Sequence, residues 1–256
     1  MNAGQIFILC EGLHDRAFWK GVLSFLGCTS LSGPALPLPV DPSGFSVRGG
    51  QNAFQGRQGG FIRVVLAHGR RGLLEGAKVL LKGRAGSKRL RCLILNSDAE
   101  ENADGTPSGH GELQFKTLLQ LARTFDPQAR RAAEHVISLD ANTRRIIAFP
   151  WRSTAPPTPG VPHQQSLERL ICGALAAVHK DRPAHLEAWL KSWPAPAPPH
   201  PREHAFSHLT RWFVEHDRYE AFCESLWNDP QIAAELRDQL ERQGVWTLIE
   251  EIAEIR

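Results

Sequence analysis

Three mainly apolar stretches of strand length constrain the fold of this chain more than any other feature. The runs occupy residues 5–10 (QIFILC), 61–67 and 90–95 (LRCLIL). Such runs are typical of strands that are buried on both faces, as in parallel sheets covered by helices. Apolar residues at helical spacing follow the first run at 15–26 and the second at 72–82. The sequence therefore predicts an α/β protein with a mostly parallel sheet and helices on both faces.

Residues 32–60 interrupt this alternation. They are rich in glycine, proline and serine, and we interpret them as a long loop or irregular insertion. A helix over 112–125, a strand over 146–149 and a helix over 165–179 complete the predicted α/β domain, which covers residues 1–180.

The chain beyond residue 180 is first rich in proline and then helical. Residues 194–201 (PAPAPPHP) have a composition that favours an extended polyproline II linker. We therefore predict a proline-rich linker region over 181–203 and a helical C-terminal subdomain over 204–256. Within these regions, helical patterns occur at 186–193, 204–215, 219–226, 230–243 and 246–256.

Composition argues against membrane and disulfide-rich proteins. The apolar runs fall far short of the ~20 residues that a membrane-spanning helix needs, and the N-terminus lacks the basic stretch of a signal peptide. The five cysteines are widely spaced and form no C-x-x-C pair, which favours buried free thiols over disulfides or a zinc site. We expect a cytoplasmic protein without a membrane partner.

Two acids follow the first strand at a spacing that suits a ligand site. Glu11 leaves the strand end, Gly12 permits a sharp turn, and Asp15 begins the helix in the pattern E-G-x-x-D. Ligands of parallel sheets bind beyond the carboxyl ends of the strands, where both carboxylates would lie. The alternative is that Asp15 only caps the helix and that Glu11 is a surface turn residue.

A second group of polar residues follows the third apolar strand. Asn96, Asp98 and Glu100 alternate there, and alternate residues of a strand point to the same side. Two ligand pairs are open, Asn96 with Asp98 or Asp98 with Glu100, and Asp98 belongs to both. Oxygen ligands suit Mg²⁺ or Mn²⁺, and a bound cation offsets the repulsion between neighbouring carboxylates. The two groups together predict a divalent-metal site.

These motifs resemble the Toprim domain. The likeness rests on the strand–E-G-x-x-D–helix pattern, on the later apolar strand that ends in acids, and on residues 167–171 (LERLI). The last stretch is similar to a helix of OLD-like nucleases and small standalone Toprim proteins, in which a further carboxylate joins the metal site. The resemblance covers roughly residues 5–180. It implies a Toprim-like fold and a Mg²⁺ or Mn²⁺ cofactor.

The resemblance also implies roles for individual residues, with one departure from the family pattern. The family's D-x-D motif falls on Asn96 and Asp98, and Asn96 is a neutral amide and a weaker ligand than aspartate. The catalytic acids that the resemblance implies are Glu11, Asp15, Asp98 and Glu168. The predicted metal ligands are these four residues together with Asn96 and Glu100.

Basic residues are concentrated between residues 48 and 91, where Glu75 is the one acid. This stretch is either a solvated face or a surface that contacts phosphates. The residues that we assign to nucleic-acid binding are Arg57, Arg63, Arg70, Arg71, Lys82 and Lys88.

Two functions remain open from the sequence. The leading hypothesis is a metal-dependent nuclease that hydrolyses phosphodiesters of DNA or RNA, with two cations activating water and stabilising the leaving oxygen. Of the two nucleic acids, DNA is the expected partner. The alternative, motivated by Asn96, is a non-catalytic nucleic-acid-binding or adaptor protein of a DNA repair or phage-defence system. The chain has no G-x-x-x-x-G-K-[ST] loop, so any ATP dependence would require a separately encoded ATPase partner.

Overall fold

Contacts divide the chain into two units. The first comprises Met1–Ser97, Gly111–Phe149 and Leu248–Arg256, and the second comprises Asp98–His110 and Pro150–Thr247. The predicted division into consecutive domains stays a prediction. The computed structural model describes residues 4–31, 51–82, 90–99, 110–156, 158, 161–192 and 219–256.

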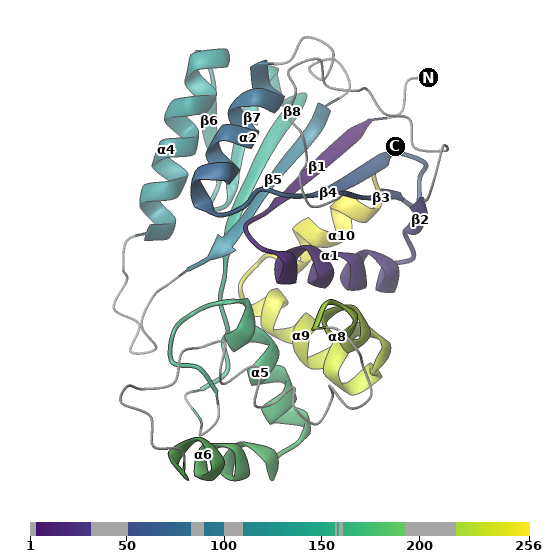
Figure 1. The fold of residues 1–256 in the computed structure, drawn as a ribbon. Coiled ribbons are helices and arrows are strands. Elements are labelled where there is room, and N and C mark those ends of the chain that lie inside the picture. The colour runs from purple at the N-terminus through teal and green to yellow at the C-terminus, as the bar shows by residue number, and fades with distance from the viewer. Residues whose placement is uncertain are drawn as a thin grey trace. The chain divides into compact units, whose positions relative to one another are not determined.

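The first unit contains an eight-stranded sheet of order β2-β3-β4-β1-β5-β8-β7-β6 (Figure 1). β1 is parallel to both β4 and β5, whereas β2-β3-β4 and β6-β7-β8 are antiparallel. The parallel centre agrees with the prediction from the three apolar runs, and the antiparallel outer strands make the sheet mixed. The strands are β1 Gln5–Cys10, β2 Thr29–Leu31, β3 Gln51–Gln55, β4 Phe61–Leu66, β5 Leu90–Asp98, β6 Arg130–Ala133, β7 Val136–Leu139 and β8 Arg144–Trp151.

Helices cover both faces of this sheet (Figure 1). On one face, Leu73 of α2 and Leu118 of α4 are fully buried in a core with Leu9 and Leu93 of the strands. On the other face, the indole of Trp19 in α1 is fully buried. The helical elements of this unit are α1 Leu13–Phe25, α2 Arg70–Lys82, α4 His110–Phe125, the 3-10 turn η2 Asp140–Asn142 and the end of α10 Trp246–Ala253.

The described part of the second unit is mainly helical. Its longest helix, α9, begins with Pro230 directly after Asp229, whose Oδ1 accepts hydrogen bonds from the N–H groups of Gln231 and Ile232. A capping aspartate and a proline at the first helical position are strong start signals, and α9 packs against α5. The helices are α5 Leu167–Val178, α6 Arg182–Ser192, α8 Tyr219–Ser225, the 3-10 turn η3 Leu226–Asn228, α9 Pro230–Arg242 and the start of α10.

One region that the sequence predicts as irregular contains regular structure, and in another a predicted helix is longer than expected. The predicted insertion over 32–60 includes β3, whose mixed sequence QNAFQ lacks an apolar run, and the turn that returns to β4. In the predicted linker region over 181–203, the helical pattern at 186–193 corresponds to the helix α6, Arg182–Ser192, which begins earlier. The remaining residues of both regions, and the predicted helix over 204–215, lie outside the described residues.

Three further strands, β2, β6 and β7, are absent from the prediction. β2 pairs with β3, β6 and β7 pair with each other as a hairpin, and β7 also pairs with β8. Every residue of β6, sequence RRAA, is exposed, so this edge strand shows no apolar pattern.

The structure describes all five cysteines and the helices named above. All five cysteines are buried and none forms a disulfide, which confirms the predicted free thiols. Within the described ranges, no helix combines the length and the apolar character that a bilayer crossing requires.

Candidate metal site

The turn between β1 and α1 holds the first two acids. Gly12 is the N-cap of α1, and its N–H donates to Asp15 Oδ2 over 2.7 Å. Asp15 is only 7% exposed, whereas the side chain of Glu11 is 24% exposed. The predicted capping role of Asp15 is confirmed. The turn therefore presents one buried carboxylate and one that reaches solvent.

The loop between β4 and α2 is bonded to this turn. The Gly69 N–H donates to the Glu11 carbonyl oxygen over 2.9 Å, and Arg70 Nε lies 4.0 Å from Glu11 Oε1. His68 and Gly69 have left-handed backbones, with φ of 58° and 90°, which turn the chain between strand and helix. A guanidinium of the protein itself thus lies beside the carboxylate of Glu11.

Gly72 allows α2 to begin close to the sheet. A Cβ atom at this position would lie 1.5 Å from the Ala67 carbonyl oxygen, so any side chain would displace the helix. The displacement would also move Arg70 away from Glu11. This role is not predicted from the sequence, where the signal is only a glycine in the first turn of a helix.

Asn96 lies beside the end of β1, because it pairs in register with Cys10. Its side chain is fully buried. Trp19 Nε1 donates to Asn96 Oδ1 over 2.7 Å, and Asn96 Nδ2 donates to the Phe149 carbonyl oxygen over 3.2 Å. The amide therefore joins α1, β5 and β8 by hydrogen bonds. An ionised aspartate could accept from Trp19 but could not donate to Phe149, which gives a structural reason for asparagine at this position.

Asp98 and Glu168 lie together in the second unit. The backbone N–H of Leu167 donates to Asp98 Oδ1 over 2.9 Å, so the first turn of α5 is bonded to the end of β5. The N-cap of α5 is Ser166, whose Oγ accepts from the Arg169 N–H. Glu168 is 6% exposed in this first turn, and Asp98 is half-buried. An anionic side chain at a helix N-terminus is stabilised by the free N–H groups there.

The described acids do not form a full set of metal ligands on their own. In this part of the chain, no set of three or more His, Cys, Asp and Glu side chains is arranged to hold a metal ion. Glu100, a predicted ligand, lies outside the described residues. Mg²⁺ in proteins often takes only one or two carboxylates and completes its shell with water and substrate phosphate. Carboxylates in such small numbers therefore suit Mg²⁺ or Mn²⁺.

The thiols next to the acids stay protonated. Burial raises the pKa of Cys10 well above its ordinary value, and the charge of Asp15 raises it further. Burial also raises the pKa of Cys172, and the charge of Glu168 adds to the shift. The acids in these turns offer carboxylate oxygens as ligands. Oxygen ligands favour Mg²⁺ or Mn²⁺ over zinc.

The predicted nucleic-acid-binding residues do not form one surface. Arg57 lies in the turn between β3 and β4, near the amino end of β4, and pairs with Glu254. Arg70 and Arg71 begin α2 after the carboxyl end of β4. Arg57 thus lies near one end of β4, and these two arginines lie beyond the other end.

The predicted role of Arg63 in nucleic-acid binding also does not fit its position. It is 4% exposed, and its guanidinium lies over the Phe7 ring at 5.7 Å, so it belongs to the interior of the sheet. Burial lowers its pKa. Arg71 and Lys82 are exposed at the two ends of α2, and Lys88 lies outside the described residues. The exposed basic residues on α2 are those that remain available for phosphates.

A cavity of about 440 Å³ in the second unit does not coincide with the acids. It lies between α5, α6 and α9, and none of the predicted site residues lines it. Small side chains such as Gly173, Ala176 and Ala177 form much of its wall. The candidate metal site therefore rests on the acids and not on this cavity.

Comparison with known proteins identifies the fold. No family model matches the chain, and no curated protein matches its sequence. The chain is similar to the crystal structure of hypothetical protein PH0156 from Pyrococcus horikoshii OT3, with a TM-score of 0.66 and 15% identity. The likeness covers 97% of this chain and 99% of that chain. The two proteins share an α/β fold along almost their whole length.

Proposed function

We propose that this protein is a nuclease that hydrolyses phosphodiester bonds in DNA or RNA with the help of Mg²⁺ or Mn²⁺, and that its fold is Toprim-like. The observation that carries the proposal is the hydrogen bond from the Leu167 N–H to Asp98 Oδ1. It brings an acid at the end of a central strand next to Glu168, which is far away in the sequence. The Toprim resemblance requires this association of a strand acid with a helix acid.

Four carboxylates would hold divalent cations. Glu11 and Asp15 are held in the β1–α1 turn, and Asp98 and Glu168 are held at the first turn of α5. When bound, the cation would lower the pKa of a water molecule and offset the charge of the phosphate. Asp15 and Glu168 are buried, so they would orient the site, while the more exposed Glu11 and Asp98 would face substrate and water.

Exposed basic residues support an anionic polymer as the substrate. Arg71 and Lys82 of α2 are exposed, and Arg70 reaches Glu11. Each phosphate neutralised by such residues releases counterions, so the affinity for nucleic acid should fall steeply with salt. We propose DNA as the preferred polymer, and any use of ATP would come from a separately encoded ATPase.

Asn96 supports a second function. Its oxygen already accepts from Trp19, and its amide donates to Phe149, so the position that is acidic in the family supplies no charge. With one acid fewer, the protein would act as a nucleic-acid-binding or adaptor protein of a repair or defence system. Salt-dependent DNA binding that EDTA leaves unchanged, without turnover, would favour this function over the nuclease.

Cleavage assays separate the two functions. Purified protein is incubated with plasmid, single-stranded DNA and structured RNA in the presence of Mg²⁺ or Mn²⁺. We expect cleavage by the wild type, and loss of cleavage in Asp98→Ala and with EDTA. A matched control is Asp229→Ala, which removes a helix-capping acid of α9 and leaves the proposed ligands intact. If the wild type cuts no substrate above the level of Asp98→Ala, the nuclease proposal is wrong.

A further inference from the structure

Gln239 is a buried polar residue on the apolar side of α9. It is 3% exposed and lies one turn from Leu236, among core positions that also include Ile232 and Leu240. A buried amide costs free energy unless its donors and its acceptor find partners. An apolar side chain would satisfy the packing of α9 equally well. The amide at this position therefore indicates a specific role for its hydrogen bonds.

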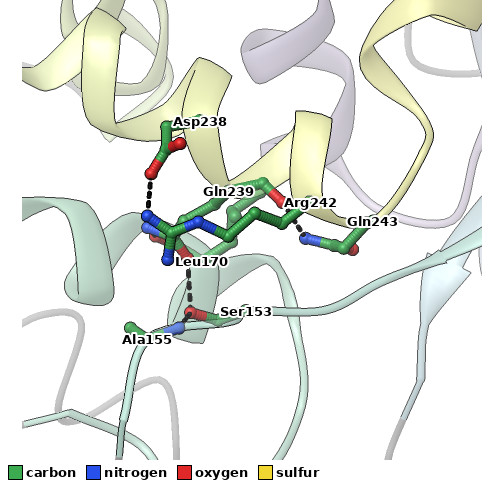
Figure 2. Close-up of polar contacts among 7 residues, drawn as sticks. All are labelled: Ser153, Ala155, Leu170, Asp238, Gln239, Arg242 and Gln243. Carbon is green, nitrogen blue, oxygen red and sulfur yellow. Dashed lines mark hydrogen bonds and ion pairs between the residues drawn. The ribbon is translucent and has the colours of Figure 1, made fainter.

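The partners of Gln239 belong to two other segments of the second unit (Figure 2). Ser153 Oγ donates to Gln239 Oε1 over 2.5 Å, and Gln239 Nε2 donates to the Leu170 carbonyl oxygen over 3.4 Å. Ser153 lies just after β8, and Leu170 lies in the first turn of α5. One side chain thus links three segments of the second unit. They are α9, the start of α5, and the connector between β8 and α5, which comprises residues 152–166.

The connector is fastened to the same helices at other points. Gln243, one turn beyond Gln239, donates through Nε2 to the Arg152 carbonyl oxygen over 2.9 Å. Within the connector, the Ser153 N–H donates to Gln165 Oε1 over 2.7 Å. From α5, the fully buried Arg169 donates to the Ala155 and Pro162 carbonyl oxygens. These bonds hold both ends of the connector against α5 and α9.

Close packing accompanies these hydrogen bonds. A Cβ atom at Gly173 would lie 2.7 Å from Ala155 Cβ and 2.9 Å from Ser153 Oγ, so the connector approaches α5 as closely as a glycine permits. Gly173 lies one turn beyond Leu170 on the same helix. The start of α5 is therefore held from the connector side and from α9.

We propose that Gln239 is a positioning residue for the acids of the second unit. It sets the first turn of α5, and this turn carries Glu168 and donates through Leu167 to Asp98. The inference that the positioned acids act on a metal rests on the proposed function. The positioning itself rests only on the hydrogen bonds and can be measured without metal.

Hydrogen exchange of the Leu167 amide measures the positioning. The variant Gln239→Met keeps a long side chain and removes both hydrogen bonds. The control Leu236→Ala destabilises the same helix from a fully buried position and leaves the amide in place. After correction for global stability, we expect exchange at Leu167 to be about tenfold faster in Gln239→Met and unchanged in Leu236→Ala. Equal exchange rates in the two variants would overturn the proposal.

A milder variant guards against a failure to fold. Ser153→Ala removes the hydroxyl that donates to Gln239 Oε1 and leaves the bond from Gln239 Nε2 to the Leu170 carbonyl oxygen in place. We expect its exchange rate at Leu167 to lie between those of the wild type and Gln239→Met. If Ser153→Ala exchanges at the wild-type rate, Gln239 does not position this turn.

A Mn²⁺ titration separates the positioning role from the proposed function. If the wild type binds Mn²⁺, we expect Gln239→Met to bind it about fivefold more weakly and Leu236→Ala to bind it like the wild type. Unchanged affinity in Gln239→Met would contradict a role for the residue at the metal site. If the wild type binds no Mn²⁺, the proposed function fails, while the exchange experiment still decides the positioning.

Discussion

Glu11 and Asp15 are held by one turn of chain, whereas Asp98 and Glu168 depend on contacts between distant segments. The bond that fixes Asp15 joins it to Gly12, three residues away. The bond that fixes Asp98 joins it to Leu167, 69 residues away, and the helix that carries Leu167 is in turn held by the connector and α9. The first acid pair is a local structure, and the second is a product of the tertiary fold.

This difference predicts how each pair responds to perturbation. The first pair should respond mainly to changes in its own turn and in the β4–α2 loop, whose Gly69 N–H donates to the Glu11 carbonyl oxygen. A pair that is held by distant segments also responds to changes in those segments, because each contact contributes to its position. The second pair is therefore the one that distant substitutions or a binding partner can alter.

The largest effect should come from Asn96→Asp, which introduces an acid beside the end of β1, close to the first pair. A carboxylate would be fully buried and would face the Phe149 carbonyl oxygen without a proton to donate. We expect a loss of about 3 kcal/mol in the free energy of unfolding at pH 7. Urea denaturation measures this loss.

The pH dependence of this variant gives a second test. Burial raises the pKa of a carboxyl in the folded state above that in the unfolded state, so the folded state binds the proton more tightly. The loss should therefore shrink as the pH falls and the carboxyl becomes protonated. The control Asn52→Asp makes the same change on β3 at a half-buried site and should cost little. If Asn96→Asp is as stable as this control, Asn96 is not the structural residue described above.

An intermediate effect should distinguish the two pairs directly. Asp98→Ala removes the acceptor of the Leu167 N–H and should cost about 2 kcal/mol, as expected for a hydrogen bond to a charged group. Asp15→Ala removes a local cap and should cost about 1 kcal/mol. In hydrogen exchange, Asp98→Ala should also accelerate amides in α5, whereas Asp15→Ala should affect only the start of α1. The reverse pattern would contradict the assignment of local and distant contacts.

The smallest effect should come from Arg70→Gln. The Arg70 guanidinium competes with a cation for Glu11, but the pair is partly exposed and its atoms are 4.0 Å apart. A partly screened pair of this kind contributes about 0.5 kcal/mol, which corresponds to an affinity for Mn²⁺ about twofold higher in the variant. The neighbouring exposed Arg71→Gln is the control and should leave the affinity for Mn²⁺ unchanged. Weaker binding in Arg70→Gln would show that the arginine does not compete with the cation.

Local features could be predicted from the sequence. The three central strands are mainly apolar, and α1 repeats its buried residues at helical spacing, so both follow from the pattern alone. The E-G-x-x-D turn is also local, because Gly12 and Asp15 satisfy each other. By contrast, the strand β6 is short and all of its residues are exposed, so its sequence shows no alternation of apolar and polar residues.

Distant contacts could be predicted only through the family resemblance or not at all. The resemblance associates Asp98 with Glu168, but nothing near Gln239 in the sequence distinguishes it from a surface glutamine. The buried Arg63 shows the same difficulty, since a single arginine within an apolar strand carries no signal of what covers it. Asn96 could be recognised as a departure from the family, but its partner Trp19 is defined only by the packing of α1 on the sheet.

A calorimetric titration with Mn²⁺ tests the central claim most directly. The proteins to compare are the wild type, Glu11→Gln from the first pair, Asp98→Asn from the second pair, and Asp229→Asn as a control outside the proposed ligands. We predict that the wild type binds Mn²⁺, that each of the two ligand variants binds it at least about tenfold more weakly, and that the control is unchanged. A wild type that binds no Mn²⁺, or ligand variants that bind it as the wild type does, would contradict the metal site proposed for these acids.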